Sequence, residues 1–219
     1  MKHYMNKFIL ALVTVSTLFL ITGCSAVGIR TSEEARYKVL VQEGAIQIRE
    51  YEPYVIAETL VKNKDYDEAG RLGFRRLFAY ISGKNEGDRE ISMTAPVIAQ
   101  RQNAPVGVEI EMTAPVVAER TGSGWVYAFV LPARFPNLES APLPADPLVK
   151  LKLIPGKKMA AITYAGSTGE KKMNLKTREL TKWIQGRQLT KASDPVSARY
   201  DPPWTLPFFR RNEVLIEVN

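Results

Sequence analysis

The order strand, strand, helix occurs twice along this chain, and it narrows the folds that the chain can adopt. In the first copy, residues 45–49 alternate apolar and polar side chains at period two, the pattern of a half-buried strand. A helix then opens at Asp65, a predicted N-cap with Glu68 three residues on, and ends before Gly83. The strands predicted in this copy are 37–41, 45–49 and 54–61.

The second copy has predicted strands at 148–154 and 159–164 and a predicted helix over about 170–185. We expect an α+β fold, a curved antiparallel sheet or barrel with two helices outside it. Further strands are predicted at 125–131, 196–200 and 213–218. The side chains expected to pack the two helices onto the sheet are Leu72, Phe74, Leu77, Phe78 and Ile81, and then Leu175, Leu180, Trp183 and Ile184.

A second repeat lies between these copies. Residues 90–101 and 109–120 are identical at nine of twelve positions, and both segments are predicted to be strand-like. Each contains a proline, Pro96 or Pro115, which cannot donate to a strand ladder and therefore belongs at an edge, a bulge or a strand switch. The methionines at the equivalent positions, Met93 and Met112, are predicted to fill gaps in the core.

The first 23 residues have the pattern of a bacterial secretory signal. Lys2 and Lys7 precede an uncharged run over 8–21, which is shorter than the about 20 apolar residues that a spanning helix needs. The run ends in Leu20-Ile21-Thr22-Gly23-Cys24, which resembles the lipobox of bacterial lipoproteins. This resemblance implies that Cys24 is acylated and becomes the mature N-terminus, with several acyl chains forming a stable anchor. The alternative is a free cysteine after ordinary signal cleavage.

The residues that follow Cys24 predict where the domain lies. Residues 24–36 form a polar tether, and Ser25 stands where an inner-membrane retention signal would have Asp. We therefore expect a lipid-anchored domain at the periplasmic face of the outer membrane. A nucleic-acid partner is not expected outside the cytoplasm, and the mature net charge of +5 suits an anionic small ligand or membrane surface.

The mature domain contains no histidine and, with Cys24 acylated, no free thiol, because the one histidine is His3. Nucleophilic sites of the Ser-His-Asp and Cys-His types are thereby excluded, as are zinc sites built on His or Cys. Bis-His and His-Met haem ligation are excluded too. We expect a binding protein and not an enzyme.

Three motifs together carry a family resemblance. They are the doubled Met-Thr-Ala-Pro-Val, Tyr200-Asp201-Pro202-Pro203, and Arg210-Arg211-Asn212-Glu213-Val214. From about Tyr37 to Val218 the chain resembles the SOUL haem-binding protein family, so residues 37–219 are expected to form one such domain. The resemblance implies a distorted antiparallel β-barrel flanked by two helices and built from two pseudo-equivalent halves, as in bacterial effector-binding domains.

The resemblance also implies a ligand, haem or a related tetrapyrrole, in a pocket against the first helix and beneath a loop near the C-terminus. By motif, Arg71 is the candidate partner of a propionate, and Phe74 and Phe78 would cover a porphyrin face. The implied binding residues are Arg71, Phe74, Arg75, Phe78, Tyr200 and Trp204. The alternatives are core packing for the two phenylalanines, solvation for the arginines, and closure of the barrel end for Trp204.

Without an axial histidine, haem would be held by apolar burial and propionate pairing, or ligated by Tyr, Met or Lys. Such binding suits a reversible carrier or buffer. The alternative function is a binding or scaffold module that uses the same barrel for another apolar ligand or a partner protein, since a fold does not fix its ligand.

Overall fold

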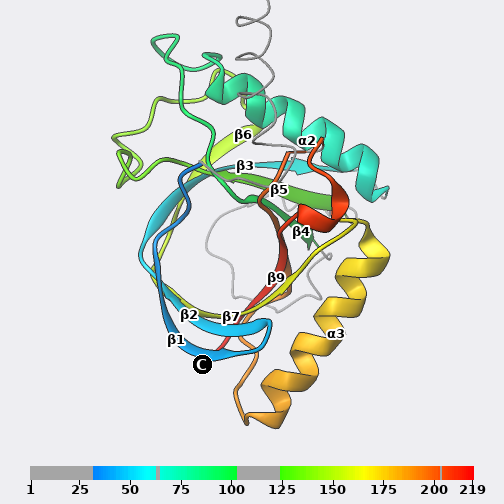
Figure 1. Ribbon diagram of the computed structural model, residues 1–219. Coiled ribbons are helices and arrows are strands. Elements are labelled where there is room, and N and C mark those ends of the chain that lie inside the picture. The colour runs from blue at the N-terminus through cyan, green and yellow to red at the C-terminus, as the bar shows by residue number, and fades with distance from the viewer. Residues whose placement is uncertain (1–31, 63–64, 103–123, 203) are drawn as a thin grey trace, which may run out of the picture.

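A computed structural model describes residues 32–62, 65–102, 124–202 and 204–219 (Figure 1). The described strands form one antiparallel sheet of nine strands in the order β1-β2-β7-β9-β8-β4-β5-β3-β6. Two helices, α2 (Tyr66–Ile81) and α3 (Glu170–Gly186), and the short 3-10 helix η1 (Pro207–Phe209) accompany it. The strands are β1 (Tyr37–Glu43), β2 (Ile46–Tyr51), β3 (Tyr54–Val61), β4 (Val97–Gln102), β5 (Gly124–Val130), β6 (Val149–Ile154), β7 (Lys157–Tyr164), β8 (Val196–Arg199) and β9 (Asn212–Glu217).

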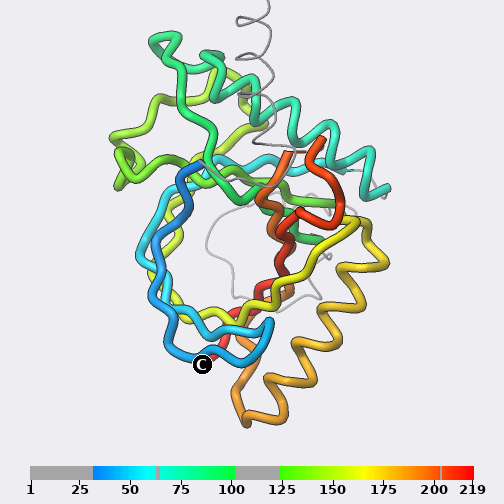
Figure 2. The backbone as a smooth tube through the Cα atoms, in the orientation of Figure 1, coloured from blue at the N-terminus to red at the C-terminus, as the bar shows by residue number. Residues whose placement is uncertain are grey.

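The sheet curls into a ring, as Figure 2 shows. It bends at two corners, because β2 and β3 form one long bent strand and β6 and β7 form another. Strand β2 runs into β3 through two residues, and β6 runs into β7 through two residues. Their antiparallel register continues across the corner, from Ile46 opposite Ile162, through Tyr51 opposite Lys157, to Thr59 opposite Val149. The α+β class and the two flanking helices are confirmed. The barrel is an open half-barrel, since β1 and β6 are edge strands that do not pair with each other.

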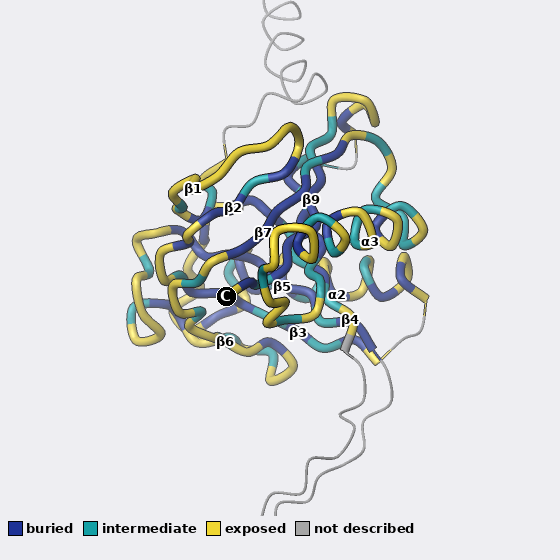
Figure 3. The backbone as a smooth tube through the Cα atoms, turned by 90° about the horizontal axis from the view of Figure 1, so that it is seen from below, coloured by how far each residue is buried: buried dark blue, intermediate teal, exposed yellow. Residues whose placement is uncertain are grey.

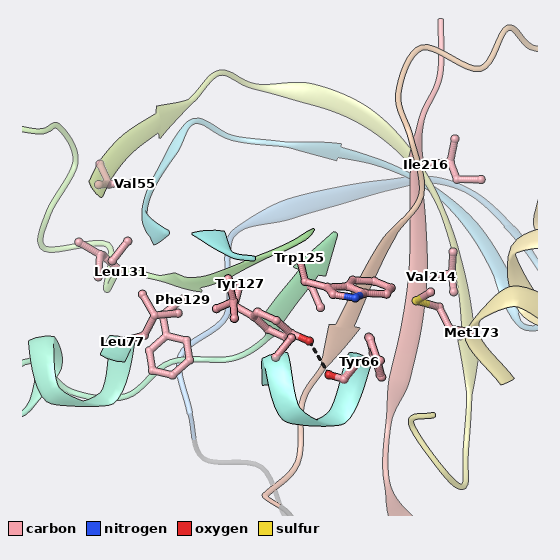
Figure 4. Close-up of a cluster of buried hydrophobic side chains, with 14 of the residues drawn as sticks. Val55, Tyr66, Leu77, Trp125, Tyr127, Phe129, Leu131, Met173, Val214 and Ile216 are labelled. Atoms are coloured by element: carbon pink, nitrogen blue, oxygen red, sulfur yellow. Dashed lines mark hydrogen bonds between the residues drawn. The ribbon is translucent and has the colours of Figure 1, made fainter. Parts of the chain in front are cut away.

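Each face of the curled sheet has its own apolar cluster, because successive side chains of a strand point to opposite faces. On β5, Trp125, Tyr127 and Phe129 point outward to the helices, whereas Ala128 and Val130 point into the ring. Figure 4 shows the outer cluster, in which the Tyr127 hydroxyl donates to the carbonyl oxygen of Tyr66 at 2.9 Å. Figure 3 shows the contrast between buried β9 and exposed β1.

Helix α2 is fixed at its start as the sequence predicts. The Asp65 side chain accepts a hydrogen bond from the backbone N–H of Glu68 at 2.7 Å. The helix presses onto the sheet at Gly73, where a Cβ atom would lie 2.7 Å from the Tyr127 ring. This close approach determines which helix face is buried, and that face consists of Tyr66, Ala69, Gly73, Leu77, Tyr80 and Ile81.

The structure corrects several expected core positions. Leu72, Phe74 and Phe78 are partly exposed, because the approach at Gly73 buries the neighbouring face of α2 instead. Leu175 is exposed on α3, where the buried side chains are Met173, Leu180 and Ile184.

The first repeat segment is a strand only from Val97 onward, and Pro96 lies just before that strand. The residues before Pro96 do not pair as a strand, and Met93 is exposed at 41% instead of filling the core. The second repeat segment, with Met112 and Pro115, lies outside the described residues, as do the signal segment and Cys24. Within the described ranges, no helix is long and apolar enough to cross a bilayer.

Candidate functional site

Four of the six expected binding residues lie together on the outer face of α2. Arg71, Phe74, Arg75 and Phe78 are spaced at i, i+3, i+4 and i+7, so they form one stripe along the helix. All four are exposed, with Phe74 at 38% and Phe78 at 47%. We call these four residues the α2 stripe. The two partly exposed rings form a small apolar patch on this helix.

The two rings of the α2 stripe are ordered by contacts with each other and with the sheet. Phe74 and Phe78 stack at 5.8 Å between ring centroids with an interplanar angle of 11°. Phe74 also meets Phe129 of β5 edge-on at 5.4 Å. The stripe therefore presents two nearly parallel rings, one of them fixed to the sheet, as an apolar surface of defined shape.

The arginines of α2 divide into one that holds the helix and two that do not. Arg76 donates from Nη1 to Thr59 Oγ1 at 3.2 Å and to the Leu60 carbonyl oxygen at 3.3 Å, which attaches α2 to β3. Arg71 and Arg75 have no ion pair or hydrogen bond with any residue that the structure describes. Both arginines lie on the same side of the helix as the two rings and are one turn apart.

The two residues expected from the C-terminal loop lie in different surroundings. Trp204 is 68% exposed on the loop before η1. Tyr200 is buried on the inner face of the sheet, where its hydroxyl donates to Glu213 Oε2 at 2.8 Å. Tyr200 follows β8 and faces the inside of the ring, on the other side of the sheet from the α2 stripe, and its part in ligand binding stays a prediction.

Tyr200 instead lines a cavity of about 160 Å³ inside the ring. The sequence reading did not identify this cavity, whose aromatic wall comes from Tyr37, Tyr51 and Tyr54. Tyr37 and Tyr51 lie 5.0 Å apart, and Tyr51 and Tyr54 lie 6.2 Å apart, between ring centroids. The only signal in the sequence is that Tyr51 and Tyr54 flank the corner at Pro53. The rest of the wall is mixed, with apolar residues such as Ile56, Val130 and Leu215 beside the charged residues Glu58, Lys152 and Lys157.

A buried charge network supports this inner wall. Glu213, fully buried on β9, accepts hydrogen bonds from both terminal nitrogens of Arg49 at 2.7 and 2.9 Å and from Arg211 Nε at 2.9 Å. Burial acts to raise the pKa of Glu213, but the hydrogen bonds and charges of Arg49 and Arg211 outweigh it and hold the pKa at about 2. Burial, and next the charge of Glu213, raise the pKa of the Tyr200 hydroxyl well above its ordinary value.

The two sites differ in what they can do chemically. In the inner network Arg49, Arg211 and Glu213 are paired with one another, so the network fixes the wall. The α2 stripe combines two apolar rings with two arginines that have no partner among the described residues. No group of three His, Cys, Asp or Glu in the described ranges could hold a metal ion.

Comparison with known proteins places this chain among relatives by sequence and by fold. A family model described as SOUL heme-binding protein matches residues 32–217. The human protein named Heme-binding protein 2 is 46% identical over 56 residues, 26% of this chain and 27% of that protein. The mouse protein of the same name is 45% identical over 56 residues, with the same shares. The matched stretch therefore spans about a quarter of the length of these relatives.

The fold is shared more widely than the sequence. The crystal structure of the EcmrR C-terminal domain superimposes with a TM-score of 0.55, over 84% of this chain and 98% of that domain. Its sequence identity with this chain is 11%, so the likeness speaks for the fold alone.

Proposed function

This chain belongs to the SOUL heme-binding protein family, and from that premise we propose that it binds haem or a related tetrapyrrole at the α2 stripe. The observation that carries the proposal is the exposure of Phe74 and Phe78 between two arginines that have no partner among the described residues. A tetrapyrrole with carboxylate side chains is planar, apolar on its faces and anionic at its rim, which matches this arrangement.

Each residue of the stripe has a role in the proposed site. Phe74 and Phe78 contact the apolar face of the macrocycle, and Arg71 and Arg75 pair with its carboxylates. The mature chain has no histidine to ligate an iron, because His3 lies in the signal segment. Binding at an exposed surface without such a ligand is reversible, so we assign the protein to transport or buffering of its ligand and not to catalysis.

We further propose that the domain is held at the cell envelope by an acylated Cys24, with residues 24–36 as the tether. The lipobox-like sequence supports the anchor, and Ser25 supports the periplasmic face of the outer membrane. Labelling of cells with a radioactive fatty acid, with a Cys24→Ala chain as control, tests the acylation. Label in both chains, or in neither, contradicts it.

A haemin titration of residues 32–219, followed at the Soret band, tests the ligand and the site. We expect a saturable one-to-one shift whose affinity falls at least about tenfold in Arg71→Ala/Phe74→Ala, since losing an ion pair and a ring contact costs more than about 1.4 kcal/mol. Leu175→Ala/Arg178→Ala on α3 is the matched control, because it also removes one exposed apolar side chain and one exposed arginine. A non-saturating shift of equal size in all three proteins would mean that haemin only adheres to apolar surface.

The inner cavity supports a second candidate function, the binding of a small apolar molecule. The cavity volume of about 160 Å³ is close to the volume of engineered protein cavities that bind benzene. Toluene is the probe, and we expect it to raise the melting temperature of the wild-type domain but not that of Ala128→Leu, whose larger side chain fills the cavity. Equal shifts in melting temperature in both proteins, or no shift in the wild type, would refute binding of toluene in the cavity.

A further inference from the structure

The loop between β8 and β9 carries an exposed apolar surface that the proposed ligand site does not use. From Pro202 to Phe209 the sequence has no charged residue. Four of its large apolar side chains are exposed, and we call these four residues the apolar loop: Trp204, Leu206, Phe208 and Phe209. Trp204 and Phe208 are about two-thirds exposed, more than any other large apolar side chain in the described ranges.

The backbone of this loop is fixed to the body of the domain, so the exposure is not the result of a loose segment. The N–H of Gly166 donates to the Pro207 carbonyl oxygen at 2.8 Å, and the N–H of Phe209 donates to the Leu206 carbonyl oxygen at 2.9 Å. Thr205 is fully buried, and its carbonyl oxygen accepts from Arg210 Nε at 2.7 Å. The fold thus holds the apolar loop in solvent, and little ordering entropy remains to be lost when a partner covers it.

The described chain begins next to the base of this loop. Glu34 forms an ion pair with Arg211 at 3.0 Å, two residues after the end of η1. The backbone N–H of Ala95 donates to the Glu33 carbonyl oxygen at 2.9 Å, which fixes the start of the chain a second time. Cys24 precedes Glu34 by ten residues, and ten extended residues span at most about 35 Å. An anchor at Cys24, as proposed above, would therefore keep Glu34, beside the base of the apolar loop, within that distance of the bilayer.

We propose that the apolar loop inserts into the interfacial region of a phospholipid bilayer and orients the domain on the membrane. Tryptophan and phenylalanine are suited to this region, because it lies between the apolar lipid chains and water. Arg210 follows the four apolar residues directly and lies at the depth of the phosphate groups. The inference goes beyond tetrapyrrole binding and does not depend on it, because none of its residues belongs to the α2 stripe.

The test uses the full chain, extracted from cell membranes and reconstituted into vesicles of phosphatidylcholine and phosphatidylglycerol. Brominated lipids quench tryptophan emission at a known depth. Of the three tryptophans, Trp125 is fully buried and Trp183 is partly buried and bonded to Glu43, so Trp204 supplies the accessible emission. We expect strong quenching by lipids brominated close to the headgroup, and loss of that quenching in Trp204→Phe.

A second pair of variants separates insertion from simple proximity. Phe208→Ser/Phe209→Ser should reduce the quenching of Trp204, whereas Leu143→Ser/Leu148→Ser, which changes two exposed leucines elsewhere, should not. A chain that stays bound to the vesicles, but whose tryptophan emission is not quenched by brominated lipid, would overturn the inference and leave the anchor intact. A chain that does not stay with the vesicles, or whose loop is instead covered by a second copy in cross-linking, would overturn it as well. Quenching of Trp204 in a chain that does not bind haemin would support insertion of the apolar loop and refute the proposed haem site at the α2 stripe.

Discussion

The two aromatic clusters of this domain lie on opposite faces of the same sheet and are built in opposite ways. On the outside, Phe74 and Phe78 stand in solvent, beside arginines that have no partner among the described residues. On the inside, Tyr51 and Tyr200 are buried and hydrogen-bonded to Arg49 and Glu213. The comparison separates two uses of aromatic residues. The inner cluster is tied into the fold by buried hydrogen bonds, whereas the two rings of the α2 stripe stay partly exposed.

Removal of the inner carboxylate should have the largest effect on stability. Glu213→Gln leaves the buried guanidinium of Arg49 without a counter-charge, and breaking a buried pair in this way costs about 3–5 kcal/mol. Urea unfolding at neutral pH measures the loss. Glu179→Gln, at an exposed ion pair on α3, is the control and should change stability by less than about 1 kcal/mol. Similar losses in both variants would remove the distinction between the two regions.

The same carboxylate makes the inner cluster sensitive to acid. The folded pKa of Glu213 is about 2, below the ordinary value of 4.5, so its contribution is complete above pH 4.5 and is lost as the pH falls toward 2. The difference corresponds to about 3 kcal/mol. Urea unfolding at a series of pH values should therefore show a steeper loss in wild type than in Glu213→Gln between pH 4.5 and 2. Parallel curves would contradict the lowered pKa.

A smaller effect on stability is expected where α2 packs against the sheet at Gly73. Gly73→Ala places a Cβ atom 2.7 Å from the Tyr127 ring, and such overpacking costs about 1–3 kcal/mol. Gly70→Ala meets its nearest atom at 3.4 Å and is the matched control, which should be neutral or stabilising by up to about 1 kcal/mol. Thermal unfolding distinguishes them, and two equal results would refute a specific contact at Gly73.

The smallest effect on stability is expected at the α2 stripe. Phe78→Ala removes an exposed ring and should change the free energy of unfolding by less than about 1 kcal/mol. The same change should weaken haemin binding clearly, as measured by the Soret titration. A large loss of stability would show that the ring belongs to the core after all.

The sequence predicted where the helices and strands lie better than it predicted which of their side chains are buried. Period-two alternation located β2, and the Asp65 cap located the start of α2, because both signals are local. The apolar residues of α2 extend around most of the helix, however, so periodicity alone did not show which of them are buried. That choice depends on Gly73 and on a ring of β5 more than 50 residues away along the chain.

The inner site was beyond the sequence for a similar reason. Arg49 occupies an alternating position in a predicted strand and has the pattern of a solvent-facing residue. Its partner Glu213 lies 164 residues further on, and only the sheet order brings the two together.

The corner shared by β2–β3 and β6–β7 has a consequence for how the chain reaches this fold. The long pairing joins residues near position 50 to residues near position 157, so neither half of the ring has a complete set of neighbours until the other half has been made. Closing so large a loop is entropically costly before any contact repays it, and chains rich in such distant pairings fold slowly. We expect assembly in a single late step on the scale of milliseconds to seconds, with no stable half-domain along the way.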